Sequence, residues 1–464
     1  MGRMRKRRGI SFGTIFMLVV TICVSAALGY VLPQLQGSQS FNATTGKVLE
    51  ALSLSDLPEL SLSDIPIMFS EPLETQAAPQ PTYAANIQLS TATAIPQLAT
   101  PIPAAETVTP HATALPTASP VPERRFTVTF TGSIMIEDSV RKGAWIDEAD
   151  KYDFTGILEY ISPELKSSDF CLAQLENIIA ARNEYSDNVT TDAMVSMLTE
   201  AGVDMVSVAY PKVANEGFEG LTSTIEALRN RGLMVVGVHP DAESAIQPAL
   251  LTFNGIKVAV LQYSDSIQNN GQKKLKNANA EYAVRVASQE TVAADIARAR
   301  QSGAAIVIVS VNWGEDDAGS PNKAQKNLAQ AIADAGADVI IGTGTKSVQK
   351  AVWLQSGNRS VLCAYSLGAL LNEGRTDKNV ASYILKLGFL VNGEGTVSIE
   401  TMECIPTYTW RYKENGKYRY YVVPSAEVAP DSMSDAQIDS KERALKNVQK
   451  ILQDAPFTVP GLVE

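Results

Sequence analysis

Two patterns of apolar and polar positions, one typical of strands and one typical of helices, alternate along the chain between residues 126 and 342. Short, largely apolar stretches with strand-like character are followed by longer stretches in which apolar positions recur at helical spacing. The expected strands cover 126–130, 171–175, 203–209, 233–237, 305–311 and 339–342, the expected helices cover 191–201, 220–231, 289–301 and 323–335, and a hairpin is expected over 251–263. Apolar strands that alternate with amphipathic helices indicate an α/β domain whose sheet is buried.

The pattern changes towards the carboxyl end of the chain. Segments 383–389, 396–402 and 408–423 alternate in the manner of antiparallel strands, and 434–453 has the spacing of a closing amphipathic helix. We therefore expect the main domain to cover 125–412. A strand and helix extension over 413–464 should pack on it.

The amino-terminal pattern is that of a membrane anchor. Five basic side chains within residues 1–9 precede an apolar run of 23 residues, 10–32, and roughly 20 helical residues cross the hydrocarbon core of a bilayer. Basic flanks stay in the cytoplasm, so the rest of the chain should be extracytoplasmic. Cleavage as a signal peptide after Val24-Ser25-Ala26 is the alternative. We favour an uncleaved, single-pass signal-anchor because a signal core usually has only about 7–15 apolar residues.

Residues 33–124 have the composition of a spacer. After residue 76 the segment is rich in Pro, Thr and Ala and carries almost no charge. Proline removes backbone donors and favours extended conformations. We expect a disordered, semi-rigid linker without chemistry of its own.

Composition excludes several classes of site. A net charge of -11 argues against nucleic acid as a partner, because a phosphate backbone is bound by clustered Lys and Arg. The chain has two histidines, His111 in the linker and His239 after a predicted strand, so a histidine-rich dinuclear metal centre is excluded. His239 follows the predicted strand 233–237. We interpret it as a loop histidine at the rim of a site formed where the strands end. The four cysteines lack zinc-site spacing. Cys171 and Cys363 either pair or, as we favour, remain buried free thiols.

Segments at the ends of the predicted strands carry a family resemblance. In chain order they include Thr131–Met135, Gln174–Glu176, Gly202–Ala209, Asn254–Ala259, Asn312–Glu315, Ala335–Gly342 and Tyr365–Gly368. In this order and spacing, the chain over about 126–412 resembles the poly-gamma-glutamate capsule biosynthesis protein CapA family. The resemblance implies a calcineurin-like metallophosphatase fold, a four-layer αββα sandwich. It also implies a role in capsule or poly-gamma-glutamate biosynthesis or export, with capsule-synthesis membrane proteins as partners.

The chain departs from the family where that family carries metal ligands. The family's Gly-Asp becomes Gly-Ser, Asn-Leu-Glu becomes Gln-Leu-Glu, His-Trp-Gly-Glu becomes Asn-Trp-Gly-Glu, and the histidines of Ala-Asn-Asn-His and Gly-His-His-Pro-His are replaced, in part by lysine. The positions that the resemblance assigns to the site are Ser133, Glu176, Lys212, Asn312, Glu315, Thr343, Lys346 and Ser366. A two-metal hydrolase needs ligands that clamp both ions and activate a water. We therefore expect no metal, no cofactor and no metal-dependent catalysis, leaving at most a weak Mg²⁺ or Ca²⁺ held by carboxylate oxygens.

Lys212 and Lys346 replace family histidines, so the resemblance predicts that both point into the former metal pocket. One hypothesis is that their ammonium groups bind an anionic polymer such as poly-gamma-glutamate. The interpretation we favour is that they pair with Glu176 and Glu315 and fill the vacated cavity. A third is that the altered site is a hydrolase or transferase for an anionic cell-surface polymer. Ser366 has no histidine nearby to act as its base.

Overall fold

The computed structural model describes residues 123–180, 185–186 and 188–462. The predicted anchor over 10–32 and the predicted linker, except its last two residues, lie outside this part of the chain. Within the described part, no helix has the length and apolar character needed to cross a bilayer.

The first sheet is mixed and contains the amino-terminal strand at its centre. Its order is β18 (Lys417–Pro424), β17 (Val397–Glu414), β16 (Ala381–Val391), β1 (Arg124–Ile134), β4 (Phe170–Leu175), β7 (Met205–Ser207) and β8 (Met234–Val236), with β15 (Ala369–Leu371) beside β1. Strands β1, β4, β7 and β8 run parallel to one another, and β16, β17 and β18 are antiparallel to their neighbours.

The second sheet is also mixed. Its order is β13 (Val348–Ser356), β14 (Arg359–Leu367), β12 (Val339–Thr343), β11 (Ile306–Asn312), β10 (Ile256–Ser264) and β9 (Ala249–Phe253). The four inner strands are parallel and the two edge strands are antiparallel. The predicted hairpin is β9–β10. Its two-residue turn, Asn254-Gly255, has positive φ at both positions, which is the Asn-Gly preference of a twisted hairpin.

Helices and short elements connect the strands of both sheets. The helices are α3 (Asp138–Gly143), α4 (Ser162–Lys166), α5 (Met194–Ala201), α6 (Gly217–Arg229), α7 (Asn269–Asn277), α8 (Gln289–Gln301), α9 (Lys323–Ala335) and α10 (Asp435–Ile451). Short 3₁₀ turns cover Asp147–Ala149, Ser244–Ile246 and Glu281–Ala283, and two small strand pairs are formed by β2 (Trp145–Ile146) with β3 (Lys151–Tyr152) and β5 (Ile178–Ile179) with β6 (Val189–Thr190).

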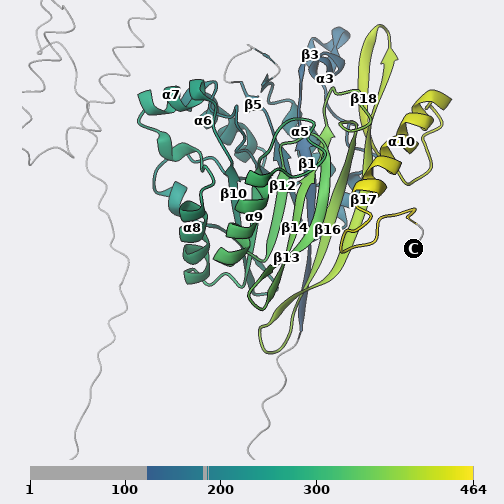
Figure 1. The fold of residues 1–464 in the computed structure, drawn as a ribbon. Coiled ribbons are helices and arrows are strands. Elements are labelled where there is room, and N and C mark those ends of the chain that lie inside the picture. The colour runs from purple at the N-terminus through teal and green to yellow at the C-terminus, as the bar shows by residue number, and fades with distance from the viewer. Residues whose placement is uncertain (1–122, 181–184, 187, 463–464) are drawn as a thin grey trace, which may run out of the picture. The chain divides into compact units, whose positions relative to one another are not determined.

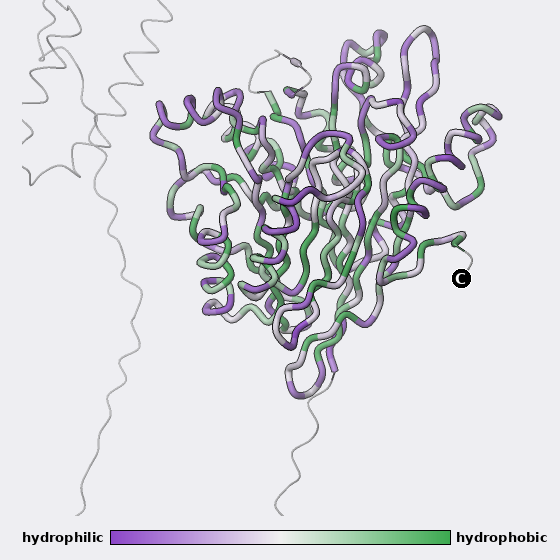
Figure 2. Tube along the Cα trace, viewed as in Figure 1, coloured by the Kyte–Doolittle hydropathy of each residue, from purple (hydrophilic) through white to green (hydrophobic). Residues whose placement is uncertain are grey.

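Alternating side chains divide the interior into three hydrophobic clusters. In β11, Ile306 and Ile308 face the first sheet, while Val307 and Val309 face α8 and α9. In β4, Leu172 likewise faces the second sheet, whereas the opposite face of that sheet packs against α5 and α6. Two stacked sheets are therefore covered by helices on their outer faces (Figure 1), and apolar residues concentrate along the strands (Figure 2). The predicted α/β architecture with buried sheets is confirmed.

The carboxyl-terminal region corrects one prediction. Segment 408–423 is not one strand, because the Asn415-Gly416 turn reverses the chain between β17 and β18. Predicted segment 383–389 lies in β16, whereas 396–402 and the first part of 408–423 belong to one long β17, so the expected boundary at 412 falls inside a strand. Helix α10 packs on β16 and β17. Cys171, Cys363 and Cys404 are buried and free, as favoured for the first two.

Candidate functional site

Four of the predicted site residues meet where parallel strands of the two sheets end. Ser133 lies near the end of β1 and Glu176 follows β4, both in the first sheet. Asn312 and Thr343 are the last residues of β11 and β12 in the second sheet. Carboxyl ends of parallel strands share one edge of a sheet, which explains why residues far apart in the chain converge here.

A buried carboxylate joins the two sheets at this edge. Ser133 Oγ donates to Glu176 Oε1 over 2.5 Å, and Asn312 Nδ2 donates to the same oxygen over 2.8 Å. Asn312 Nδ2 also lies 3.3 Å from Thr343 Oγ1. Burial raises the pKa of Glu176, and the hydrogen bonds from Ser133 and Asn312 offset only part of that effect. The site therefore holds a carboxyl group that ionises less readily than an exposed one.

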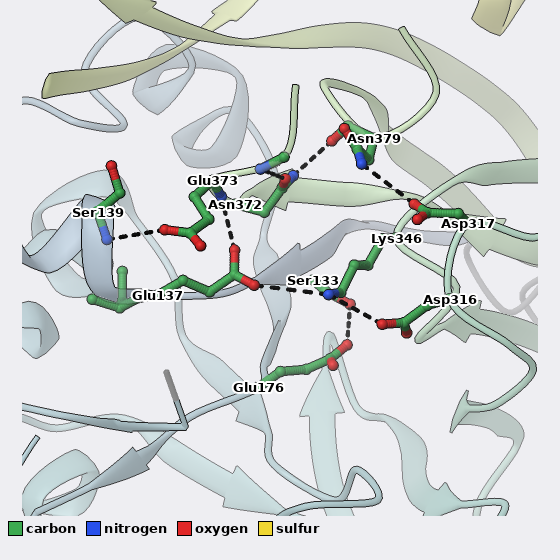
Figure 3. A network of polar contacts seen from close by, with 12 residues as sticks. Ser133, Glu137, Ser139, Glu176, Asp316, Asp317, Lys346, Asn372, Glu373 and Asn379 are labelled. Atoms are coloured by element: carbon green, nitrogen blue, oxygen red, sulfur yellow. Dashed lines mark hydrogen bonds and ion pairs between the residues drawn. The ribbon is translucent and has the colours of Figure 1, made fainter. Parts of the chain in front are cut away.

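Lys346 stands beside this carboxylate within a group of acidic side chains. Its Nζ lies 3.1 Å from Asp316 Oδ2 and 3.7 Å from Glu137 Oε1, and Figure 3 shows the three side chains converging. Burial alone would lower the pKa of Lys346, but the charges of Asp316 and Glu137 outweigh it and raise that pKa. The backbone has φ of 58°, a conformation that L residues rarely adopt. The ammonium is thus held in place and remains charged at neutral pH.

The acidic group continues through residues that sequence reasoning did not identify. Glu137 Oε2 accepts a hydrogen bond from Glu373 N over 2.8 Å, and Glu373 Oε2 accepts one from Ser139 N over 3.0 Å (Figure 3). Glu137 and Glu373 follow β1 and β15, which pair in parallel. Their positions shortly after strand ends were the only signal in the sequence, and no motif marked them.

The other predicted residues lie apart from this cluster. Lys212 and Glu315 are exposed. The backbone carbonyl of Lys212 accepts a hydrogen bond from Asn188, which fixes the loop after β7. Ser366 is buried and accepts hydrogen bonds from Thr345 Oγ1 over 2.9 Å and Gly368 N over 3.1 Å.

The ion pairs differ from those expected. Lys346 pairs with Glu137 and Asp316 instead of Glu176 or Glu315, and Lys212 forms no ion pair with a described residue. The physical reason is that the loop after β12 turns the Lys346 side chain towards the end of β1.

The donor set does not fit a divalent cation. In the part of the chain that the structure describes, no group of three or more His, Cys, Asp or Glu side chains could hold a metal ion. Glu176 Oε1 already accepts two hydrogen bonds, from Ser133 Oγ and Asn312 Nδ2. Neither of these two donor groups carries the negative charge that a carboxylate ligand would bring. The Lys346 ammonium would also repel a nearby cation.

Sequence comparison identifies the class of protein. Residues 127–373, just over half of the chain, match the family described as "Bacterial capsule synthesis protein PGA_cap". The chain belongs to this family, which confirms the resemblance to CapA proteins.

Two relatives are named for capsule or polymer biosynthesis. The chain is 24% identical over 334 residues to "Capsule biosynthesis protein CapA" of Bacillus anthracis, covering 68% of this chain and 78% of that protein. It is 25% identical over 283 residues to "PGA biosynthesis protein CapA" of Bacillus subtilis (strain 168), covering 59% of this chain and 70% of that protein.

Solved structures give weaker matches. The calcineurin-like phosphoesterase YfkN from Bacillus subtilis is 12% identical with a TM-score of 0.35, and the match covers 71% of this chain and 99% of that chain. The NAD nucleotidase NadN of Haemophilus influenzae is 13% identical with a TM-score of 0.38, and the match covers 74% of this chain and 65% of that chain.

Glu176→Gln should change how the stability of the protein depends on pH. The folded-state pKa of Glu176 is raised, so the wild-type protein gains stability below the unfolded value of 4.5 and loses it as pH rises through the folded pKa. Glutamine cannot ionise, so the variant does not lose stability in this way as pH rises. The free energy of unfolding of the variant, relative to wild type, should therefore be higher at about pH 7.5 than at about pH 4.

Urea unfolding at both pH values measures this difference. Glu315→Gln removes an exposed carboxylate from a neighbouring loop and controls for lost charge. A difference between Glu176→Gln and wild type that stays constant with pH would contradict the prediction.

Proposed function

We propose that this chain is a membrane-anchored, extracytoplasmic and non-catalytic component of capsule or poly-gamma-glutamate biosynthesis or export. Two relatives named for capsule and PGA biosynthesis support the pathway. The basic segment 1–9 followed by the apolar run 10–32 supports a single-pass anchor in the cell membrane. Capsule-synthesis membrane proteins and an anionic polymer are the partners that this role requires.

The observation that carries the non-catalytic role is the ion network around Lys346. A half-buried ammonium, held by Glu137 and Asp316 beside Glu176, stands where the CapA-like pattern places metal ligands. An ammonium can balance those carboxylates, but it cannot bind a water and lower its pKa as a metal ion does. The network therefore favours a site that stabilises the fold over one that hydrolyses a substrate.

The same network argues against anion binding at Lys346. An incoming carboxylate or phosphate would meet Glu137, Glu176 and Asp316 before it could neutralise the lysine. Contact with an anionic polymer is then better placed on other cationic parts of the surface. Exposed Lys212 on the loop after β7 is one of them.

A hydrolase or transferase is the second candidate. It is favoured by the hydrogen bond from Ser133 Oγ to Glu176, a carboxylate with a raised pKa next to a lysine. A carboxylate in this position could accept a hydroxyl proton. Against it, Ser133 is fully buried and has no access for a polymer substrate.

Complementation distinguishes these roles. In a strain that lacks the gene, we would express full-length wild-type chain, Ser133→Ala, Glu176→Gln, and a chain whose residues 1–32 are replaced by a cleavable signal peptide. Surface polymer is then measured per cell, with immunoblots to equalise protein amounts. We expect both site variants to restore polymer to the wild-type amount and the released chain to fail.

Other outcomes overturn specific parts of the proposal. Loss of polymer with both site variants, at wild-type protein amount and without loss of thermal stability, would contradict the non-catalytic role and favour the hydrolase or transferase. Full polymer with the released chain would exclude a need for the anchor. No effect of deleting the gene on surface polymer would remove the pathway itself.

A further inference from the structure

A cavity separate from the Glu176 site lies between the end of β8, the 3₁₀ turn Ser244–Ile246, β10 and α8. Its volume is about 180 Å³, whereas a single water needs about 10–15 Å³ of such space. The cavity can therefore hold a small molecule. None of the residues that surround Lys346 lines it.

Three arginines, Arg229, Arg285 and Arg298, line this cavity together with Asp295. Asp295 is buried, and both of its carboxylate oxygens already accept hydrogen bonds. It accepts from Arg285 Nη2 over 2.7 Å on Oδ1 and 2.5 Å on Oδ2, from Arg298 Nη1 over 2.5 Å, and from Tyr263 Oη over 3.0 Å. One lining carboxylate thus faces three lining cations.

Arg285 and Arg298 share Asp295 as their ion-pair partner, which leaves the charge of Arg229 unpaired among the described residues. Arg229 is exposed at the cavity and its side chain forms no ion pair or hydrogen bond with a described residue. Arg285 is held in a fixed orientation by its two-pronged contact with Asp295. A fixed guanidinium loses little conformational freedom when it binds a second anion.

His239 also lines the cavity, and its pKa reflects the charges around it. Burial and then the charge of Arg285 lower the pKa of His239 to about 4, and the opposing charges of Asp295 and Asp241 do not reverse this. The imidazole is neutral at pH 7, so it adds neither charge nor repulsion. Positive potential in the cavity comes from the arginines.

We infer that this cavity is a binding site for a small anion that carries a carboxylate or phosphate group, held by Arg229, Arg285 and Arg298. Planar guanidinium groups match both kinds of oxyanion through paired N–H donors. This inference is independent of the proposed role in capsule biosynthesis, and either can fail without the other.

Calorimetric titration of the full-length chain in detergent tests the inference. One probe is inorganic phosphate and the other is γ-glutamylglutamate, so that phosphate and carboxylate recognition are measured separately. The variants are Arg229→Gln and Arg298→Gln. Arg231→Gln is the matched control, because Arg231 lies two residues from Arg229 but contacts Ser196 and Asp192 outside the cavity.

We expect at least one probe to bind wild type and Arg231→Gln equally. Each cavity variant should weaken that binding by about tenfold or more, which corresponds to about 1.4 kcal/mol, because it removes a charge-assisted hydrogen bond to the anion. Arg229→Gln breaks no internal contact, so its loss of affinity cannot be attributed to unfolding. Failure of both probes to bind, or equal affinity in wild type and Arg229→Gln, would overturn the inference.

Discussion

Trp313→Ala is expected to lower the free energy of unfolding by about 3–5 kcal/mol, the usual cost of deleting a buried tryptophan. Trp313 follows β11 and is 1% exposed. Its ring stacks on Tyr365 with centroids 5.9 Å apart, and Nε1 donates to the Tyr365 carbonyl over 2.8 Å. Alanine would leave both a cavity and an unpaired buried carbonyl.

Trp353→Ala is the matched control for this loss. Trp353 lies on edge strand β13 and is 39% exposed, so its replacement should cost less than about 1 kcal/mol. Urea unfolding of the three proteins provides the measurement. Equal destabilisation by the two alanine variants would show that Trp313 does not anchor the end of β11.

Asp295→Ala is expected to destabilise the protein by a similar amount, roughly 3–5 kcal/mol. The carboxylate is 6% exposed and compensates Arg285 and Arg298. Removing it leaves two guanidinium groups close together and deprives Tyr263 Oη of its acceptor. The helix α8, which carries Asp295 and Arg298, should lose its attachment to the segment around Arg285.

Asp192→Ala controls for removal of an aspartate. Its carboxylate is 66% exposed and lies 3.9 Å from Arg231, so the expected change is below about 1 kcal/mol. Thermal and urea unfolding compare both variants with wild type. A loss below about 1 kcal/mol for Asp295→Ala would mean that water already solvates the two arginines.

Much of the architecture could be predicted because burial on both faces leaves a clear sequence pattern. The run Ile306–Asn312 is apolar throughout, since alternate residues pack against the other sheet and against helices. The turn at Asn415-Gly416 was missed inside a continuous strand pattern, although Asn-Gly is a hairpin signal. Helix α7 buries only Gly271 and Leu275 and so leaves almost no apolar periodicity.

The site was predictable to the extent that strand ends fix it. Ser133, Glu176 and Asn312 meet because each lies at the end of a parallel strand. The partners of Lys346 were not predictable, since they depend on how the loops after β1 and β11 reach across the two sheets. The exposure of Lys212 depends in the same way on the path of the loop after β7.

The central position of β1 has a mechanical consequence. The strand begins at Arg124, next to the proposed tether, and pairs with β16 from Arg124 to Phe130 and with β4 from Val128 onwards. A pull on the chain ahead of Arg124 along the strand axis would load these hydrogen bonds in shear, so that many must break together. An edge strand peeled from one side would release its bonds one at a time. The proposed tether would therefore join the domain at a place suited to resist drag at a cell surface.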